Sequence, residues 1–426
     1  MAGRGTITLC YGLTGVMNAL WGATLPATDA RLELGPGRLG GLLMALAAGA
    51  LVAMPVAGRL ADRWTGRRLL RACAPAAALA LTGPALATRV ETLMISAVVL
   101  GMLFGLLNVA LSVQAVAVER TLGRPIMATV HGTWTLGAVA GGAIITTALR
   151  AGADVRALMA AGAITLATAL ATALATALAT VKGPPDAPAR PAGGARDAPA
   201  RSDRGAPDAR ARSDRAARRA APLRPGLLAL LGVIGAAAFV TEGAATDWAG
   251  VHATRVLGAD PATGSLVYTV FFVAMTLVRF VGDALRTRLG VVRTTRLAGA
   301  TATAGYGLVL LAGVLPASAR VGCAMAGWAL AGAGMAVVWP IVASLLGTAD
   351  GAARRLSAVT TISYGGGLIG PALIGYVATT ATLPLALVIP AALALLVATA
   401  APPLLHTVVR TVAAADHPIA ASRRTP

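Results

Sequence analysis

Charged residues are scarce in this chain: they make up 12% of its 426 residues, against roughly 25% in a typical soluble domain. Cysteine is scarcer, and Cys10, Cys73 and Cys323 lie far apart in apolar stretches, which argues against a disulfide framework or a metal cluster. The only lysine, Lys182, is followed by glycine and proline, so the sequence has no Gly-x-x-x-x-Gly-Lys-Ser/Thr phosphate loop. The four histidines form no His-Glu-x-x-His pattern. We therefore expect no enzyme, no bound metal and no cofactor.

Apolar residues dominate instead: they make up 57% of the chain, and the mean hydropathy is +0.74. They form stretches of the ~20 residues that a helix needs to cross a hydrocarbon core about 30 Å thick. The first stretch is longer than the apolar region of a secretory signal, and more apolar sequence follows it, so we expect no cleavage there. The sequence predicts an all-α integral membrane protein with twelve transmembrane helices, at residues 7–28, 39–60, 69–88, 92–118, 126–149, 155–181, 226–251, 263–282, 295–315, 321–346, 357–378 and 383–405.

Basic residues divide unevenly between the loops on the two sides of the predicted membrane. If the N-terminus is cytoplasmic, the cytoplasmic segments hold 29 of the 36 Lys and Arg residues, and the opposite segments hold 7. This bias follows the positive-inside rule and predicts a bacterial plasma-membrane protein with both termini in the cytoplasm. The net charge of +19 is then explained by topology, and we expect contacts with membrane lipids, no nucleic-acid partner and a monomeric chain.

The longest polar interruption, residues 182–225, repeats the units Asp-Ala-Pro-Ala-Arg and Arg-Ser-Asp-Arg. It has no aliphatic periodicity that a core could bury, so it is predicted to be a disordered linker near anionic lipid headgroups, with a regulatory role as the alternative. The predicted organisation is an N-terminal six-helix bundle at 1–181, the basic linker at 182–225, a C-terminal six-helix bundle at 226–405 and a cytoplasmic tail at 406–426.

The two predicted bundles share a weak internal repeat. Trp21-Gly22-Ala23-Thr24 aligns with Glu242-Gly243-Ala244-Ala245 at an offset of 221 residues, and Asp62 aligns with Asp283 at the same offset. The matched residues lie in corresponding spans of each half, which favours two pseudo-symmetric copies of one six-helix unit.

The segment between the second and third predicted spans reads Gly58-Arg59-Leu60-Ala61-Asp62-Arg63-Trp64-Thr65-Gly66-Arg67-Arg68. It resembles the Gly-x-Leu-Ala-Asp-Arg-x-Gly-Arg-Arg signature of the major facilitator superfamily, with one additional residue before the second glycine. Residues 279–283 resemble a degenerate second copy. The resemblance implies two six-helix bundles around a central cavity.

A carboxylate at a helix end can pair with nearby arginines and accept hydrogen bonds from a neighbouring helix N-terminus. The signature therefore predicts a latch between the bundles on the cytoplasmic side, with topology-setting charge as the alternative. The expected residues of this gate motif are Gly58, Asp62, Arg63, Gly66, Arg67, Arg279 and Asp283.

A second motif, Gly137-Ala138-Val139-Ala140-Gly141-Gly142, resembles the Gly-Pro-x-x-Gly-Gly signature of exporter branches of the same family, with Ala138 in place of proline. Close packing of two helices through small residues explains the same pattern equally well. Glu242 to Trp248, in the seventh span, resembles a segment of a bacterial subgroup of these permeases.

Polar side chains inside spans are costly unless they face water, a ligand or a partner. We expect Glu242 to bind a proton or to contact the substrate. For Asp247 the alternative is a helix cap at the outer interface. For Asn18, Asn108, Gln114 and Trp21 the alternative is packing between helices. For His131 the alternative is an interfacial pair with Glu119. The expected coupling and substrate residues are Glu242, Asp247, Asn18, Asn108, Gln114, Trp21 and His131.

Without a nucleotide-hydrolysing motif, a transporter of this family must use an ion gradient or run downhill. The resemblance and the intramembrane carboxylates predict a secondary active transporter that moves a small molecule by alternating access, coupled to protons, with export favoured. The alternatives are uptake of a sugar-like solute and a sensor of the same fold that does not transport.

Overall fold

The computed structural model describes residues 2–64, 66–122, 126–179, 225–347 and 352–416. Over these residues the chain is helical, without strands. The predicted linker lies outside the described residues, except for Pro225. The N-terminal half comprises α1 (Ala2–Gly22), α2 (Leu25–Leu32), α3 (Gly35–Arg63), α4 (Gly66–Ala80), α5 (Thr82–Leu86), α6 (Val90–Leu122), α7 (Met127–Arg150) and α8 (Val155–Ala179).

The C-terminal half begins with α10 (Pro225–Ala244), which continues through a π-helix, η1 (Ala245–Ala249), into α11 (Gly250–Arg255). Two long helices, α12 and α15, pack against the N-terminal half, on α7 and α3 respectively. The remaining order is α12 (Pro261–Ala312), α13 (Ala317–Met335), α14 (Val338–Gly347), α15 (Ala352–Thr380), α16 (Leu383–Ala386), α17 (Val388–Thr399) and α18 (Ala401–Asp416).

Eight of the described helices are long and apolar enough to cross a membrane, or nine if the bent pair formed by 383–399 and 401–410 counts as one span. The other three predicted spans, 7–28, 295–315 and 357–378, are also helical over most of their length. The predicted spans 263–282 and 295–315 lie on either side of Gly290, whose non-helical backbone (φ 75°, ψ 162°) divides α12 into two helices. One expected boundary needs correction, because the last helix continues to Asp416, past the predicted end at 405.

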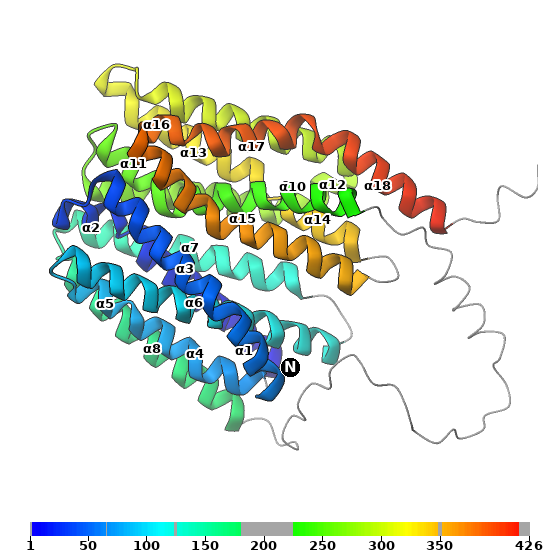
Figure 1. Ribbon diagram of the computed structural model, residues 1–426, viewed down its shortest axis with the longest axis horizontal. Helices are drawn as coiled ribbons and strands as arrows, with labels where there is room; N and C mark the ends of the chain where they lie inside the picture. Colours follow the sequence, from blue (N-terminus) through cyan, green and yellow to red (C-terminus); the bar gives the residue numbers. More distant parts are fainter. Residues whose placement is uncertain (1, 65, 123–125, 180–224, 348–351, 417–426) are drawn as a thin grey trace, which may run out of the picture.

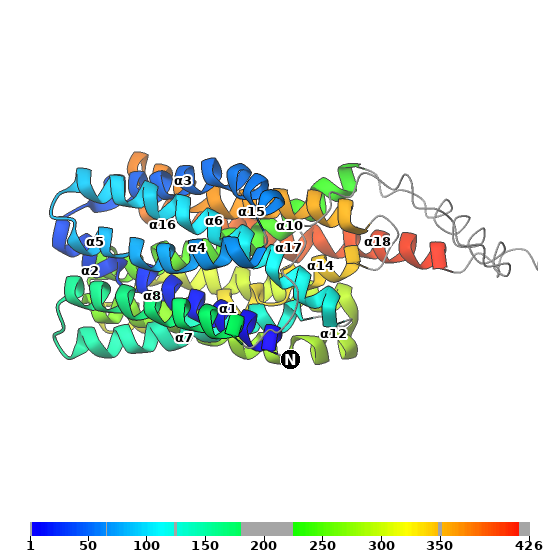
Figure 2. The ribbon, with the colours of Figure 1, turned by 90° about the horizontal axis from the view of Figure 1, so that it is seen from below.

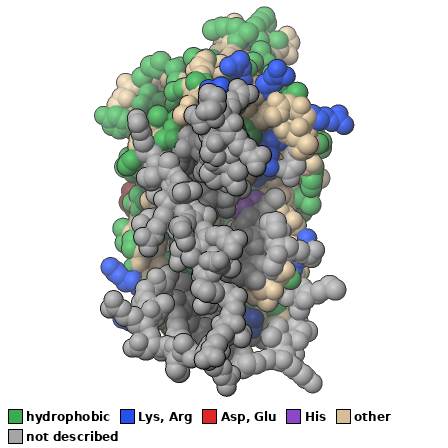
Figure 3. All heavy atoms as spheres, turned by 90° about the vertical axis from the view of Figure 1, so that its right-hand side faces the viewer, with side chains coloured by type: hydrophobic (Ala, Val, Ile, Leu, Met, Phe, Trp, Pro, Cys, Tyr) green, Lys and Arg blue, Asp and Glu red, His purple; other side chains and the backbone are tan. Residues whose placement is uncertain are grey.

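The helices run lengthwise along one axis, and the loops between them alternate between two ends (Figures 1 and 2). We call one of these the linker end, because α8 ends there at Ala179 and α10 begins there at Pro225. The opposite end, which holds the turns α2–α3 and α11–α12, is called the closed end. Figure 3 views the linker end, where basic side chains lie at several places around the edge.

Small residues bring helices within the N-terminal half into close contact. A Cβ added to Gly15 would overlap the backbone carbonyl of Trp134, and one added to Gly137 would overlap that of Gly12. Helices α1 and α7 therefore pack backbone to backbone, as small residues allow in membrane bundles. The packing explanation of the 137–142 glycine motif thus has direct structural support.

The same kind of contact joins the two halves near the closed end. Gly40 of α3 meets Gly375 of α15, where a Cβ on Gly40 would lie 2.7 Å from the Gly375 Cα. Figure 1 shows α3 and α15 close together at this end and separating toward the linker end. The interface between the halves is therefore tightest at the closed end.

Candidate substrate and coupling site

The predicted proton-binding residue, Glu242, forms an ion pair near the middle of the molecule. Its Oε2 atom lies 3.2 Å from an Arg279 guanidinium nitrogen, and both side chains are 18% exposed. Glu242 lies near the end of α10, and Arg279 lies on α12, more than two turns before the break at Gly290. The sequence grouped Arg279 with the cytoplasmic gate motif, whereas its guanidinium here contacts the Glu242 carboxylate. The pair is therefore mostly buried, with a small part of each side chain exposed.

Aromatic side chains of the C-terminal half lie in a cluster beside α10. The Phe239 ring centroid is 4.4 Å from that of Tyr364 and 5.1 Å from that of Trp339. All three side chains are partly exposed. Phe239 lies one turn before Glu242 on α10, so the cluster and the ion pair belong to one surface. Aromatic faces of this kind bind flat or apolar groups and attract cations.

The N-terminal half contributes a histidine and a tyrosine at the same level. The rings of Tyr11 on α1 and His131 on α7 meet edge to face, with centroids 5.5 Å apart. His131 lies near Arg279 of the other half, and Tyr11 lies near Tyr364. Polar groups of both halves therefore lie close to the ion pair, and the expected role of His131 in the cavity stays a prediction.

Asp247 and Trp21 form a direct link between the halves. The Trp21 indole N–H donates to the Asp247 carboxylate over 3.2 Å, and both side chains are buried. Asp247 lies in the π-helix η1, a local widening that often marks functional sites. Asp247 accepts its described hydrogen bond from Trp21 of the opposite half, which does not support the alternative of a cap at the outer interface.

Two further hydrogen bonds cross the interface nearby. The Asn18 side-chain amide donates to the Tyr268 hydroxyl over 3.0 Å, and the hydroxyls of Thr146 and Ser265 lie 2.9 Å apart. Asn18 thus serves contact between the halves, the helix-packing alternative for this residue. Neither Tyr268 nor Ser265 was singled out from the sequence.

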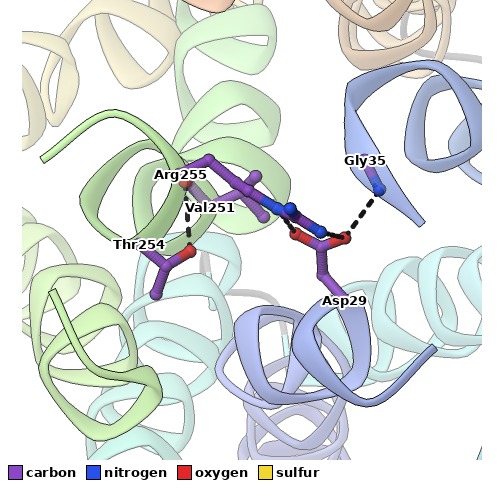
Figure 4. Close-up of polar contacts among 5 residues, drawn as sticks. All are labelled: Asp29, Gly35, Val251, Thr254 and Arg255. Atoms are coloured by element: carbon purple, nitrogen blue, oxygen red, sulfur yellow. Dashed lines mark hydrogen bonds and ion pairs between the residues drawn. The ribbon is translucent and has the colours of Figure 1, made fainter. Parts of the chain in front are cut away.

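An ion pair fastens the two halves at the closed end (Figure 4). The Arg255 guanidinium of α11 contacts both oxygens of the Asp29 carboxylate of α2, at 2.6 and 2.8 Å. The Asp29 side chain is 1% exposed and that of Arg255 is 39% exposed. The backbone N–H of Gly35 donates to Asp29 Oδ1 over 3.0 Å. Bidentate arginine–carboxylate geometry of this kind is among the stronger polar contacts in proteins.

Asp29 and Arg255 were missed from the sequence. Arg255 counted only toward the charge bias, and Asp29 lies directly after the first predicted span. The available signal was weak: two opposite charges, each at the end of an apolar stretch on the same predicted side of the membrane. Their 226-residue separation hid the pairing.

The remaining predicted cavity residues lie elsewhere. Asn108 of α6 is exposed. Gln114 lies with Thr6 and Arg67 in a cavity of about 40 Å³ between helices of the N-terminal half. The structure therefore does not bring Gln114 together with the Glu242–Arg279 pair.

The gate motif lies at the linker end, where α3 passes into α4. Gly58 and Arg63 are on α3, and Gly66 and Arg67 begin α4. The side chains of Asp62 and Asp283 fall outside what the structure describes, so the latch they were expected to form stays a prediction.

Asp260, just outside the membrane-spanning part of α12, caps that helix. Its carboxylate accepts the N–H groups of Ala262 and Thr263 and the Thr263 hydroxyl, at 2.6–3.0 Å. The Thr263 hydroxyl and these amides hold the pKa of Asp260 below its ordinary value. The cap fixes the start of the helix that carries Arg279.

The geometry defines a membrane protein built from two helical halves, joined at one end, with a charged and aromatic site between them. Comparison with known proteins gives the family. The model of the Major Facilitator Superfamily matches residues 7–347. The chain belongs to this superfamily.

Relatives from bacteria align over nearly the full chain. An uncharacterized transporter, y4wD, of Sinorhizobium fredii is 29% identical over 395 residues, which cover 92% of this chain and 95% of the relative. An uncharacterized MFS-type transporter of Yersinia pestis is 28% identical, covering 92% and 93%. The membrane protein MosC of Rhizobium meliloti is 28% identical, covering 86% and 82%.

Solved structures share the fold at low sequence identity. The nucleoside transporter NupG superposes with a TM-score of 0.65 at 13% identity, over 95% of this chain and 99% of that one. A bacterial homologue of the lysosomal transporter Spinster superposes with a TM-score of 0.61 at 15% identity, over 96% and 97%. The predicted family and all-α fold class are confirmed, and the chain is a multi-pass membrane protein of a transporter family.

Proposed function

We propose that this protein is a secondary active transporter that moves a small molecule by alternating access. One observation carries the proposal: the Asp29–Arg255 pair joins the halves at the closed end, while the Glu242–Arg279 pair, midway along the molecule, stays partly exposed. Among the described residues, the closing ion pair lies on one side of the central site, which is what one state of an alternating-access cycle requires. Release of the closed end, with closure at the other end, would give the opposite state.

The linker end is proposed to face the cytoplasm and the closed end the outside. The basic bias supports this orientation, because the arginines of the 58–68 motif and of 286–296 lie toward the linker end and the linker itself is rich in arginine. Both termini would then be cytoplasmic, and the structure would represent a state open toward the inside.

Proton coupling is proposed to act through Glu242 and Asp247. Protonation of Glu242 would remove the negative charge that holds Arg279, and separation of the halves at the closed end would break the hydrogen bond from Trp21 to Asp247. Each carboxylate would therefore have a different partner in the two states, which is the requirement for a bound proton to shift the equilibrium.

The substrate is proposed to be a small neutral or weakly charged molecule with a flat or apolar part. The Phe239–Trp339–Tyr364 cluster would contact that part, and Arg279 and His131 would contact a polar group. Export is placed ahead of uptake, because the 137–142 stretch resembles the exporter signature. The same glycines also pack against α1, and the direction of transport is therefore to be decided by experiment.

The test is a transport screen in proteoliposomes made from the purified chain. A panel of neutral, acidic and basic solutes is offered with an inward or outward pH gradient, and accumulation is compared with protein-free vesicles. We expect at least one class to accumulate against its gradient, and we expect a protonophore to abolish that accumulation. Binding of a solute without any flux would instead favour a sensor of the same fold.

A further inference from the structure

Five buried polar atoms in the C-terminal half have no protein hydrogen-bond partner among the described residues, one of them Thr276 Oγ1. The other four belong to side chains that are at most 1% exposed. These four side chains come from α10, α11, α13 and the part of α12 that follows Gly290. The four atoms are Thr241 Oγ1 of α10, His252 Nδ1 of α11, Tyr306 Oη of α12 and Trp328 Nε1 of α13.

These four side chains are neighbours. The ring centroids of Tyr306 and Trp328 are 5.6 Å apart, and those of His252 and Trp328 are 6.5 Å apart. The hydroxyls of Thr241 and Tyr306 face each other without a well-formed hydrogen bond between them. Thr241 precedes Glu242 directly in the chain. The cluster therefore lies inside the C-terminal half, next to the helix turn that carries the central ion pair.

Leaving such a cluster dry is costly, because a buried polar group without a good partner has lost its hydrogen bonds to water and gained none in the fold. Lipid around the bundle offers no partners. Interior cavities that are lined by polar groups hold ordered water, whereas apolar ones stay dry.

We propose that Thr241, His252, Tyr306 and Trp328 form an internal binding site for ordered water in the C-terminal half. The ligand is matched to the lining: the Trp328 N–H donates, the two hydroxyls donate and accept, and the unpartnered His252 nitrogen does either according to its tautomer. A water molecule with two to four such neighbours is fully hydrogen-bonded.

The site gives Glu242 a polar neighbourhood on the side away from the substrate surface. Arg279 faces Glu242 directly, and Tyr268 and Tyr364 lie near it. Water beside this turn would stabilise the separated charges when Glu242 exchanges its proton. That role rests on the proposed proton coupling, whereas the water site itself does not.

X-ray radiolytic footprinting tests the site on the unmodified chain in lipid nanodiscs, because radicals formed from bound water label the side chains next to them. The chain offers a matched control. Trp248 and Trp328 are both 0% exposed, but the Trp248 N–H donates to the Pro371 carbonyl over 3.1 Å. We expect Trp328 to be labelled at least several-fold faster than Trp248. Equal, slow labelling of the two tryptophans would overturn the water site.

A second measurement uses isosteric substitutions that remove one polar atom each. In a dry pocket, Thr241→Val and Tyr306→Phe would delete unsatisfied groups, and thermal midpoints would stay equal or rise. In a hydrated pocket both would lower the midpoint, because the water loses a partner. Thr295→Val is the control, since Thr295 is 1% exposed and its hydroxyl bonds the Val291 carbonyl of its own helix. A rise in both variants would contradict the proposal, whether or not the chain transports protons.

Discussion

The Asp29–Arg255 pair offers a quantitative test of how the closed end is held. Asp29→Asn removes the charge and keeps an oxygen that can accept the Gly35 N–H, so the turn between α2 and α3 should survive. Breaking a fully buried ion pair costs about 3–5 kcal/mol, and an exposed pair contributes about 0.2–1 kcal/mol. Asp29 is 1% exposed and Arg255 39% exposed, which places the loss between these limits, at about 2 kcal/mol by the same principles.

If the pair exists only while the closed end is shut, this loss acts on the conformational equilibrium. A change of 1.4 kcal/mol is tenfold in an equilibrium constant, so about 2 kcal/mol would raise the population open at this end roughly 30-fold. Stability of the fold should change less, because both halves keep their own cores.

The assay is the labelling rate of a cysteine at Ser265, which is fully buried at the interface between the halves. The background replaces Cys10, Cys73 and Cys323, and a membrane-impermeant maleimide is added to intact cells. We expect Asp29→Asn to increase the labelling rate by one to two orders of magnitude. Arg255→Gln should act similarly, and the double variant should add little more. An unchanged rate in both single variants would refute the assignment of the pair as a closing contact.

Three other predictions follow. Asp260→Ala should lower the thermal midpoint, because it removes a helix cap with a typical contribution of about 1 kcal/mol, whereas Asp260→Asn should stay close to wild type. The pKa of Asp260 is lowered in the fold, so the stability that its carboxylate contributes should be present near neutral pH and fade as the pH falls through that lowered value. Thermal midpoints measured over a series of pH values would show this. Gly40→Val should force α3 away from Gly375 and speed Ser265 labelling, whereas equal rates would contradict the tight contact. Asp62→Asn should reduce transport sharply at normal membrane abundance, and Asp283→Asn more mildly; unchanged flux in the double variant would leave both as topology markers.

Composition and periodicity predicted the class of protein because they report bulk properties. A long apolar run in a chain this poor in charge can satisfy its backbone only as a membrane helix, so the all-helical architecture followed. Boundaries were harder, because they depend on local backbone choices. The 43° bend near Ala400 carries no break in hydropathy that would reveal it, whereas the arginine-rich stretch around Gly290 separated two predicted spans.

The site was only partly accessible from the sequence. Glu242 stood out because a carboxylate inside a span demands a reason, but its partner Arg279 also fits a degenerate gate motif, and only tertiary structure decides between the two contacts. Gln114 and Asn108 looked equivalent to Asn18 by type and depth, yet helix rotation directs them elsewhere. Asp29 and Arg255 lie at span ends, where charge is common, so nothing local marked them as partners.

We propose that a proton on Glu242 couples to movement of a solute through this site. The most direct measurement compares pH-gradient-driven flux with equilibrium exchange in the same proteoliposomes, for wild type and Glu242→Gln, using a solute that the wild-type chain accumulates. The glutamine keeps the shape of the protonated acid and cannot release a proton. If Glu242 carries the coupled proton, the variant loses gradient-driven accumulation while exchange persists. Full pH-driven accumulation by Glu242→Gln would contradict it.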